Sequence, residues 1–293
     1  MQTRHFDQLP KAYLAYPKVV QGLVQQQIEQ RVQKKPRPAA VLPQVEYVVD
    51  SLKIDSEHLK KYQQICHFAQ DHTVPAMYLA VLAQSLQMHM MTNELFPFAL
   101  LGLVHIANQI KQYRVMHSSE VFELSCRFGD LTPHEKGLQF DFIVTAKVAG
   151  ETVFEGKTTY LSRGKSNQTT AVKSNDGKVL DLKQKTSWQV EENLGRRYAL
   201  ISGDFNFIHL HAVPAKLFGF NRAIAHGMWS KARTLAALSP LPAAYEADVA
   251  FKLPMFLPSQ VSLMTAEDGK NTDFVLQNSN NQKPHLAGKL LAL

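Results

Sequence analysis

Residues 75–91, which read PAMYLAVLAQSLQMHMM, constrain the fold of this chain of 293 residues more than any other segment. Apolar residues lie almost all the way round the helix that this segment predicts, so the helix must be largely buried. A proline at the first helical position suits a helix start, because the N–H that it lacks has no partner there. Segments with strand-like alternation follow at residues 120–127, 138–148 and 152–161. This order predicts an α+β layer in which an antiparallel sheet covers a central helix.

The second half of the chain repeats this arrangement. A helical pattern within residues 201–238 precedes four strand-like segments, at residues 248–256, 260–266, 273–277 and 284–293. The sequence identity between the two halves is slight. We therefore interpret the repeat as a duplication of architecture only.

A polar segment that contains several lysines, residues 164–186, predicts a linker between the two halves. We therefore divide the chain into a peripheral N-terminal arm over residues 1–40, a first domain over residues 41–163, the linker, and a second domain over residues 187–293. Within the arm, the apolar residues of 19–32 are spaced as in a short amphipathic helix.

Composition narrows the class of protein. The formal net charge of +7 suggests an anionic partner, which could be a nucleic acid, an acidic lipid or a phosphate-bearing ligand. Cys66 and Cys126 both lie among apolar neighbours, which predicts buried free thiols in a reduced, cytoplasmic compartment. The first residues hold no apolar core of signal-peptide length, and the most apolar run, residues 96–107, is too short to span a bilayer. We therefore expect no membrane association.

Polar residues gather in two clusters within residues 198–232, and the first cluster is residues 204–209, which read DFNFIH. The carboxylate of Asp204 and the imidazole of His209 stand five positions apart and can converge on one water molecule. Such a pair can activate water and return a proton to a neighbouring carbon. Asn206 lies between them and can orient either group. Taken alone, the cluster also fits an Asp/Asn turn followed by a surface histidine.

The second cluster is residues 224–228, which read IAHGM and precede a clear helix pattern. Gly227 is expected in the first helical turn, where an N–H has no intrahelical partner and the helix dipole favours negative charge. A glycine also leaves room for a ligand carbonyl, so its N–H can serve as an oxyanion hole without any side chain. Close helix packing that only glycine permits is the alternative explanation.

Taken together, the two clusters resemble the signature of the MaoC-like dehydratases, or (R)-specific enoyl-CoA hydratases. That signature is an Asp-x-Asn-Pro-(Ile/Leu)-His run followed by a Gly-Phe-x-x-x-Ile-Ala-His-Gly-Met run. In this chain the runs are residues 204–209 and 219–228. Residues 249–258 are similar to the family's Phe-Lys-x-Pro strand, and residues 96–114 are similar to the opening domain of its two-domain members.

The resemblance implies a double hot-dog fold, in which each of two long central helices is wrapped by an antiparallel sheet. The first domain is then a degenerate unit that accommodates substrate, and the second domain is catalytic. The two sheets pair, so the protein is expected to be a pseudo-dimeric monomer or a homodimer.

The resemblance also implies the reaction, which is reversible hydration of trans-2-enoyl thioesters to (R)-3-hydroxyacyl thioesters without a cofactor. Asp204 and His209 are then the residues that activate water, Asn206 orients the site, and the Gly227 N–H binds the thioester oxygen. The substrate is carried by CoA or acyl carrier protein, and the positive charge fits such a phosphate-bearing carrier better than a nucleic acid. Further candidate substrate-binding residues are Tyr198, Ser202, Arg222 and His226.

Two positions depart from the family pattern. Phe207 stands in place of the usual proline, which makes the turn before His209 less rigid, and His211 stands where the family often has aspartate. Both departures could change the selectivity for the acyl chain.

Two other classes of function remain open. His209, His211 and His226 could together bind zinc, but the resemblance is to a non-metal enzyme and no acidic cluster completes the set, so we expect no metal. A non-catalytic acyl-thioester-binding protein on the same fold is the main alternative, because a fold does not determine function. The presence of both Asp204 and His209 favours the enzyme.

Overall fold

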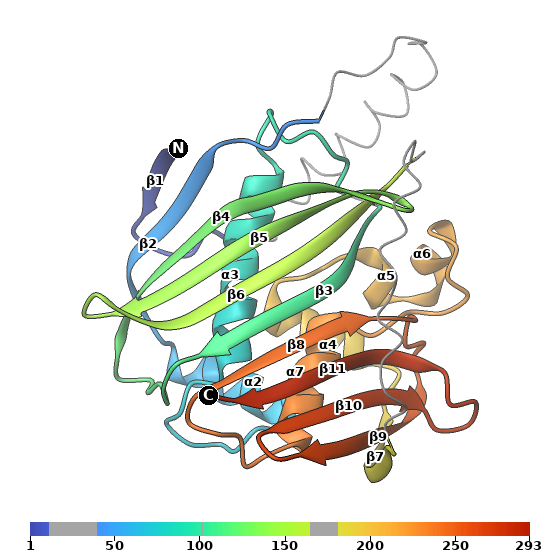
Figure 1. The fold of residues 1–293 in the computed structure, drawn as a ribbon. Coiled ribbons are helices and arrows are strands. Elements are labelled where there is room, and N and C mark those ends of the chain that lie inside the picture. The colour runs from blue at the N-terminus through green and yellow to red at the C-terminus, as the bar shows by residue number, and fades with distance from the viewer. Residues whose placement is uncertain (12–39, 101, 165–180) are drawn as a thin grey trace, which may run out of the picture.

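The computed structural model describes residues 1–11, 40–100, 102–164 and 181–293. In these ranges eleven strands form one continuous sheet, in the order β1-β2-β4-β5-β6-β3-β8-β11-β10-β9-β7 (Figure 1). The amphipathic helix expected at residues 19–32 lies outside the described residues, as does most of the expected linker.

The first unit of the fold consists of strands β2 to β6 and helices α2 and α3. Its elements are β2 (Val45–Lys53), α2 (Ser56–Cys66), α3 (Ala76–Met91), β3 (Leu103–Gln112), β4 (Val121–His134), β5 (Gly137–Val148) and β6 (Glu151–Arg163). Most side chains of α3 are buried, as its apolar composition predicts. Figure 1 shows α3 running behind β4, β5 and β6.

The second unit consists of strands β7 to β11 and helices α4 to α7. Its elements are β7 (Lys183–Val190), α4 (Leu194–Ser202), α5 (Phe207–Leu210), α6 (Ala212–Leu217), α7 (Gly227–Ala237), β8 (Tyr245–Phe251), β9 (Ser259–Asp268), β10 (Asn271–Asn278) and β11 (Pro284–Ala292). Helix α7 takes the central place here, and with 11 residues it is shorter than α3, which has 16.

The strands of the two units follow the same spatial order. The first unit runs β2-β4-β5-β6-β3 and the second runs β7-β9-β10-β11-β8, so each unit places its second strand beside its fifth. Those two second strands, β3 and β8, pair antiparallel from Ala107–Ala250 to Gln112–Tyr245 and join the units into one sheet. This arrangement is the predicted double hot-dog fold, and it confirms the duplication of architecture.

A buried lysine holds the seam between the units together. Lys231 of α7 is fully buried, and its Nζ donates hydrogen bonds to the backbone O of Asn108 (2.7 Å), to Asn108 Oδ1 (2.7 Å) and to the backbone O of Ala247 (2.9 Å). Asn108 lies in β3 and Ala247 in β8. One side chain therefore connects the second central helix to both strands of the seam.

Two edge strands depart from the expected boundaries. Strand β1 (Gln2–Phe6) pairs parallel with β2, so the start of the expected peripheral arm belongs to the sheet. Strand β7 begins at Lys183, so the last residues of the expected linker belong to the second unit. Both strands are mostly exposed, and exposed edge strands do not need the apolar alternation by which the other strands are recognised.

Strand β3 is also absent from the sequence-based expectations, although it forms the seam. Pro97 and Gly102 interrupt the apolar run that leads into it, and its own residues do not alternate clearly. Cys66 and Cys126 are free and buried, as expected. Among the described residues, none of the helices is both long enough and apolar enough to cross a membrane.

Candidate active site

Asp204 lies in the turn that follows α4. Gly203 ends that helix in a left-handed conformation, with φ of 72°, which glycine adopts without strain. The Asp204 N–H donates to Ser202 Oγ (3.2 Å), and Asp204 Oδ1 accepts from the N–H of Asn206 (3.1 Å). These short-range bonds are the Asp/Asn turn that the sequence indicates, and they direct the chain into α5.

His209 lies on α5, a helix of four residues that Asn206 caps through Oδ1 and the Ile208 N–H (3.4 Å). The His209 Nδ1–H donates to the backbone O of Ile224 (2.8 Å). Because a neutral imidazole carries one proton, this bond leaves Nε2 as the unprotonated nitrogen that can accept a proton. Burial lowers the pKa of His209 below its usual value, although the charge of Asp204 opposes this shift.

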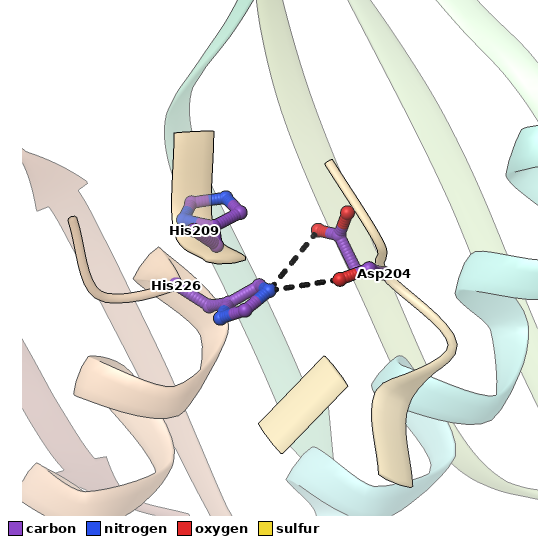
Figure 2. A group of neighbouring side chains, drawn as sticks. All are labelled: Asp204, His209 and His226. Atoms are coloured by element: carbon purple, nitrogen blue, oxygen red, sulfur yellow. Dashed lines mark hydrogen bonds and ion pairs between the residues drawn. The ribbon is translucent and has the colours of Figure 1, made fainter. Parts of the chain in front are cut away.

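His226 lies immediately before α7 and contacts both Asp204 and His209. Its Nε2–H donates to the backbone O of Asp204 (3.0 Å) and lies 4.0 Å from Asp204 Oδ2 (Figure 2). Its ring stacks on that of His209, with centroids 3.7 Å apart and 27° between the planes. Burial lowers the pKa of His226, and the neighbouring His209 lowers it further. Both rings are therefore neutral at neutral pH.

Gly227 is the first residue of α7. The N–H groups in the first turn of a helix have no partner within that helix, and the helix dipole makes this end partly positive. A Cβ at Gly227 would lie 3.1 Å from the ring of Phe251, so a larger residue at this position would be crowded by that ring. Gly227 thus provides a backbone donor directly after His226, whose ring stacks on that of His209.

The possible ligand atoms of Asp204, His209 and His226 lie within 4.8 Å of one another, which is close enough to raise the question of a metal. A metal must lie near the plane of each imidazole that it binds, at ~2.1 Å from the nitrogen. The rings of His209 and His226 are stacked, so no single point lies in both ring planes and also at that distance from a nitrogen of each ring. In addition, one nitrogen of each ring already binds a backbone carbonyl. The arrangement suits acid–base chemistry better than metal binding.

The zinc set of three histidines that the sequence raised is not assembled. His211 is exposed and caps α6, where its Nδ1 accepts from the Val213 N–H (3.3 Å). Asp204, rather than His211, joins His209 and His226.

The other candidate residues have varied positions. Ser202 is buried and accepts from the Asp204 backbone. Tyr198 is 1% exposed, its ring lies 5.0 Å from that of His226, and among the described residues its hydroxyl has no hydrogen-bond partner. Burial raises its pKa well above the usual value. Arg222 is exposed, and its guanidinium lies over the ring of Phe256 rather than at the cluster.

Residues that the motifs do not include also reach the cluster. Gln84 of α3 donates from Nε2 to Asp204 Oδ2 (3.0 Å), so the first unit contributes directly to the site. Gly195 of α4 allows close contact with α5, because a Cβ there would lie 1.9 Å from the backbone O of His209. Sequence reasoning missed both residues. Gln84 lies 120 positions from Asp204 along the chain, so no spacing pattern connects them. The contact at Gly195 depends on how α4 packs against α5, which the sequence does not show.

The double hot-dog fold places a carboxylate and two histidines beside a helix N-terminus, an arrangement that can support acid–base chemistry. Residues 175–286 match the family described as MaoC like domain. The chain is 30% identical over 254 residues to 3-hydroxyacyl-thioester dehydratase X of Mycobacterium tuberculosis, covering 86% of this chain and 91% of that protein. The chain therefore belongs to the MaoC-like dehydratase family, and it is a hydro-lyase.

Solved structures agree with this assignment. The crystal structure of HtdX from Mycobacterium tuberculosis superposes with a TM-score of 0.75 at 29% identity, over 85% of this chain and all of that one (100%). A MaoC-like dehydratase from Phytophthora capsici gives a TM-score of 0.71 at 15% identity, over 88% and 98%. A conserved hypothetical protein from M. tuberculosis, described as a double hotdog fold, gives 0.54 at 10% identity, over 83% and 95%. The last two likenesses concern the fold alone.

Proposed function

We propose that this protein catalyses the reversible hydration of trans-2-enoyl thioesters to (R)-3-hydroxyacyl thioesters. The observation that carries the proposal is the convergence of Asp204, His209 and His226 next to the N-terminus of α7. The name of the M. tuberculosis relative, a 3-hydroxyacyl-thioester dehydratase, supports the same substrate class. The (R) configuration and the 2-enoyl substrate come from the motif resemblance.

In this mechanism Asp204 and His209 hold one water molecule between them. The Nε2 of His209 is the free acceptor, since Nδ1 donates to Ile224. As the water oxygen adds to C3 of the enoyl thioester, one water proton passes to this pair and a proton is delivered to C2 on the same face. The reverse sequence eliminates water from the 3-hydroxyacyl thioester.

The Gly227 N–H stabilises the charge that forms on the thioester oxygen. Addition at C3 moves electrons toward the carbonyl, so negative charge grows there in the enolate-like transition state. A donor that is already oriented stabilises that charge more than it stabilises the ground state. No cofactor is required, because the thioester carbonyl itself makes C3 electrophilic.

The test is turnover of crotonyl-CoA and a longer trans-2-enoyl-CoA, followed by loss of the enoyl thioester absorbance and by chiral analysis of the product. Asp204→Asn and His209→Ala should each abolish turnover while the fold is retained. His211→Asn is the matched control: it changes an exposed histidine two positions away and keeps a good helix cap. Normal turnover in both site variants, or an (S) product, would contradict the proposal.

The same assay separates the enzyme from the binding protein. Acyl-thioester binding without turnover would indicate the non-catalytic alternative, and absence of binding would exclude both. Comparing CoA with acyl-carrier-protein thioesters identifies the carrier. We further propose that each chain is a pseudo-dimer of two domains, in agreement with the paired β3 and β8, and that it acts in the reducing cytoplasm, in agreement with its two free thiols.

A further inference from the structure

Gln84 is a polar residue on a helix that is otherwise largely buried among apolar side chains. It lies on α3, the central helix of the first unit, and its Nε2 donates to Asp204 Oδ2 at 3.0 Å. An ionised carboxylate has only acceptors, so the amide nitrogen, not the oxygen, must face it. The first unit therefore places a donor on the carboxylate of the second unit.

The two oxygens of Asp204 receive donors from different parts of the chain. Oδ1 accepts from the backbone N–H of Asn206 (3.1 Å), which belongs to the same turn, and Oδ2 accepts from Gln84. The Asn206 bond, and the bond from His226 to the Asp204 backbone O, hold the turn within the second unit but do not link it to α3. The Gln84 bond ties the turn to a rigid central helix, which restricts both the rotation and the position of the carboxylate.

The other end of the same amide points to a role in the site. Gln84 Oε1 is buried, and among the described residues it has no hydrogen-bond partner. Buried polar atoms are usually paired, so an orphan acceptor next to a reactive cluster needs an explanation.

We propose that Gln84 is a positioning residue of the active site, which holds the Asp204 carboxylate in the orientation that activates water. This inference rests on the proposed function, because it concerns the water-activating role of Asp204. The first unit then helps to position a residue of the active site, in addition to any role in accommodating the acyl chain.

The first test is Gln84→Met, which keeps the length of the side chain and removes the donor. We expect kcat to fall ~10–100-fold, because a misplaced catalytic group loses rate steeply, while KM changes less than about threefold. The matched control is Gln109→Met. Gln109 Nε2 of β3 donates to Glu246 Oε1 of β8 at 2.6 Å, so it is also a glutamine–carboxylate bond between the units. We expect kcat of this control to be that of the wild type.

The second test is Gln84→Glu, measured against pH. A protonated glutamic acid can donate to Asp204, whereas an ionised one repels it. The activity of this variant relative to the wild type should therefore recover as the pH is lowered. A merely structural role for Gln84 would not produce this dependence on pH.

The outcomes separate the inference from the proposed function. Wild-type turnover together with an unchanged kcat in Gln84→Met would overturn the inference alone. Equal losses in Gln84→Met and Gln109→Met would assign the effect to contact between the units and would also overturn it, as would Gln84→Glu without recovery at low pH. A wild-type protein that turns over neither enoyl nor 3-hydroxyacyl thioesters would overturn both.

Discussion

The imidazole rings of His209 and His226 stack on each other, with centroids 3.7 Å apart, although the two residues belong to separate clusters of the sequence. Both rings are buried, and burial lowers the pKa of each, because an imidazolium loses its hydration there. A charge on one ring also disfavours a charge on the other. The pair is therefore kept neutral, which is the state that a general base requires.

This neutrality predicts the dependence of activity on pH. The folded pKa of His209 is below the usual 6.5, so its Nε2 remains a base at pH values where an exposed histidine is already protonated. We expect kcat/KM to be constant near neutral pH and to decline only below about pH 6.5. The profile is measured with crotonyl-CoA, with circular dichroism at each pH to exclude unfolding. An acidic limb at or above the usual histidine pKa would contradict the prediction.

A pair of substitutions at Gly227 isolates the backbone donor. His226 has φ of −66° and ψ of 134°, a conformation that a following proline favours, and proline is well tolerated at the first helical position. Gly227→Pro should therefore keep α7 but remove the N–H. Gly227→Ala keeps the N–H and adds a Cβ that also meets Phe251.

We expect kcat of Gly227→Pro to be ~100-fold or more below that of Gly227→Ala, which is the loss typical of one oxyanion donor. Helical content is compared by circular dichroism. Equal activities in the two folded variants would show that the Gly227 N–H does not act on the transition state.

The buried imidazole of His105 is expected to make the stability of the fold depend on pH. Its ring stacks on Tyr160, at 4.9 Å, and lies edge-on to Phe251, at 4.7 Å, and burial lowers its pKa to about 4. The unfolded chain then binds the proton more tightly than the folded one, so this contribution to stability is complete above about pH 6.5 and is lost as the pH falls toward 4. Thermal unfolding should show a lower Tm at about pH 5 than at about pH 7.5.

His105→Phe keeps an aromatic ring and removes the titrating group. Its Tm should therefore fall less than that of the wild type over the same range of pH. An identical fall in both proteins would assign the acid sensitivity to other groups, such as His209 and His226.

The hydrogen bonds of Lys231 are expected to stabilise the seam between β3 and β8. Lys231→Met keeps most of the apolar volume but leaves the Asn108 and Ala247 oxygens without their donor. Because unpaired buried acceptors are costly, we expect the free energy of unfolding to fall by about 3 kcal/mol, as measured by denaturation with urea. Lys270→Met, at an exposed turn between β9 and β10, should change it by less than about 0.5 kcal/mol. Equal stabilities would mean that these bonds contribute nothing net.

Much of the fold could be predicted because its elements have strong local patterns. The apolar helix at α3 and the hairpin of β5 and β6 are examples: the turn between them places Ala149 and Gly150 at φ of 49° and 82°. The edge strands β1 and β7 could not be recognised, since an exposed strand carries no apolar alternation. Strand β3 was missed because its own residues do not alternate clearly, and its pairing with β8 joins residues more than 130 positions apart.

The candidate site divides in the same way. Asp204, Asn206 and His209 could be identified because one short run brings them together through a turn and a cap. His226 was expected among the substrate-binding residues, and its stacking on His209 is a further contact that the sequence did not predict. The hydrogen bond from His209 Nδ1 to the backbone O of Ile224 brings the segment that contains His226 against His209, and this is a tertiary interaction.

The local order of residues determines the helices, most strands and the turn and cap of residues 204–209, because turns, caps and apolar periodicity act over a few residues. Tertiary structure decides which strands form the seam, how the two histidines stack, and that Gln84 reaches Asp204 from the other unit. These contacts join segments whose separation along the chain is large, so no spacing in the sequence encodes them. They form only when two sheets pair and bring both central helices to one face.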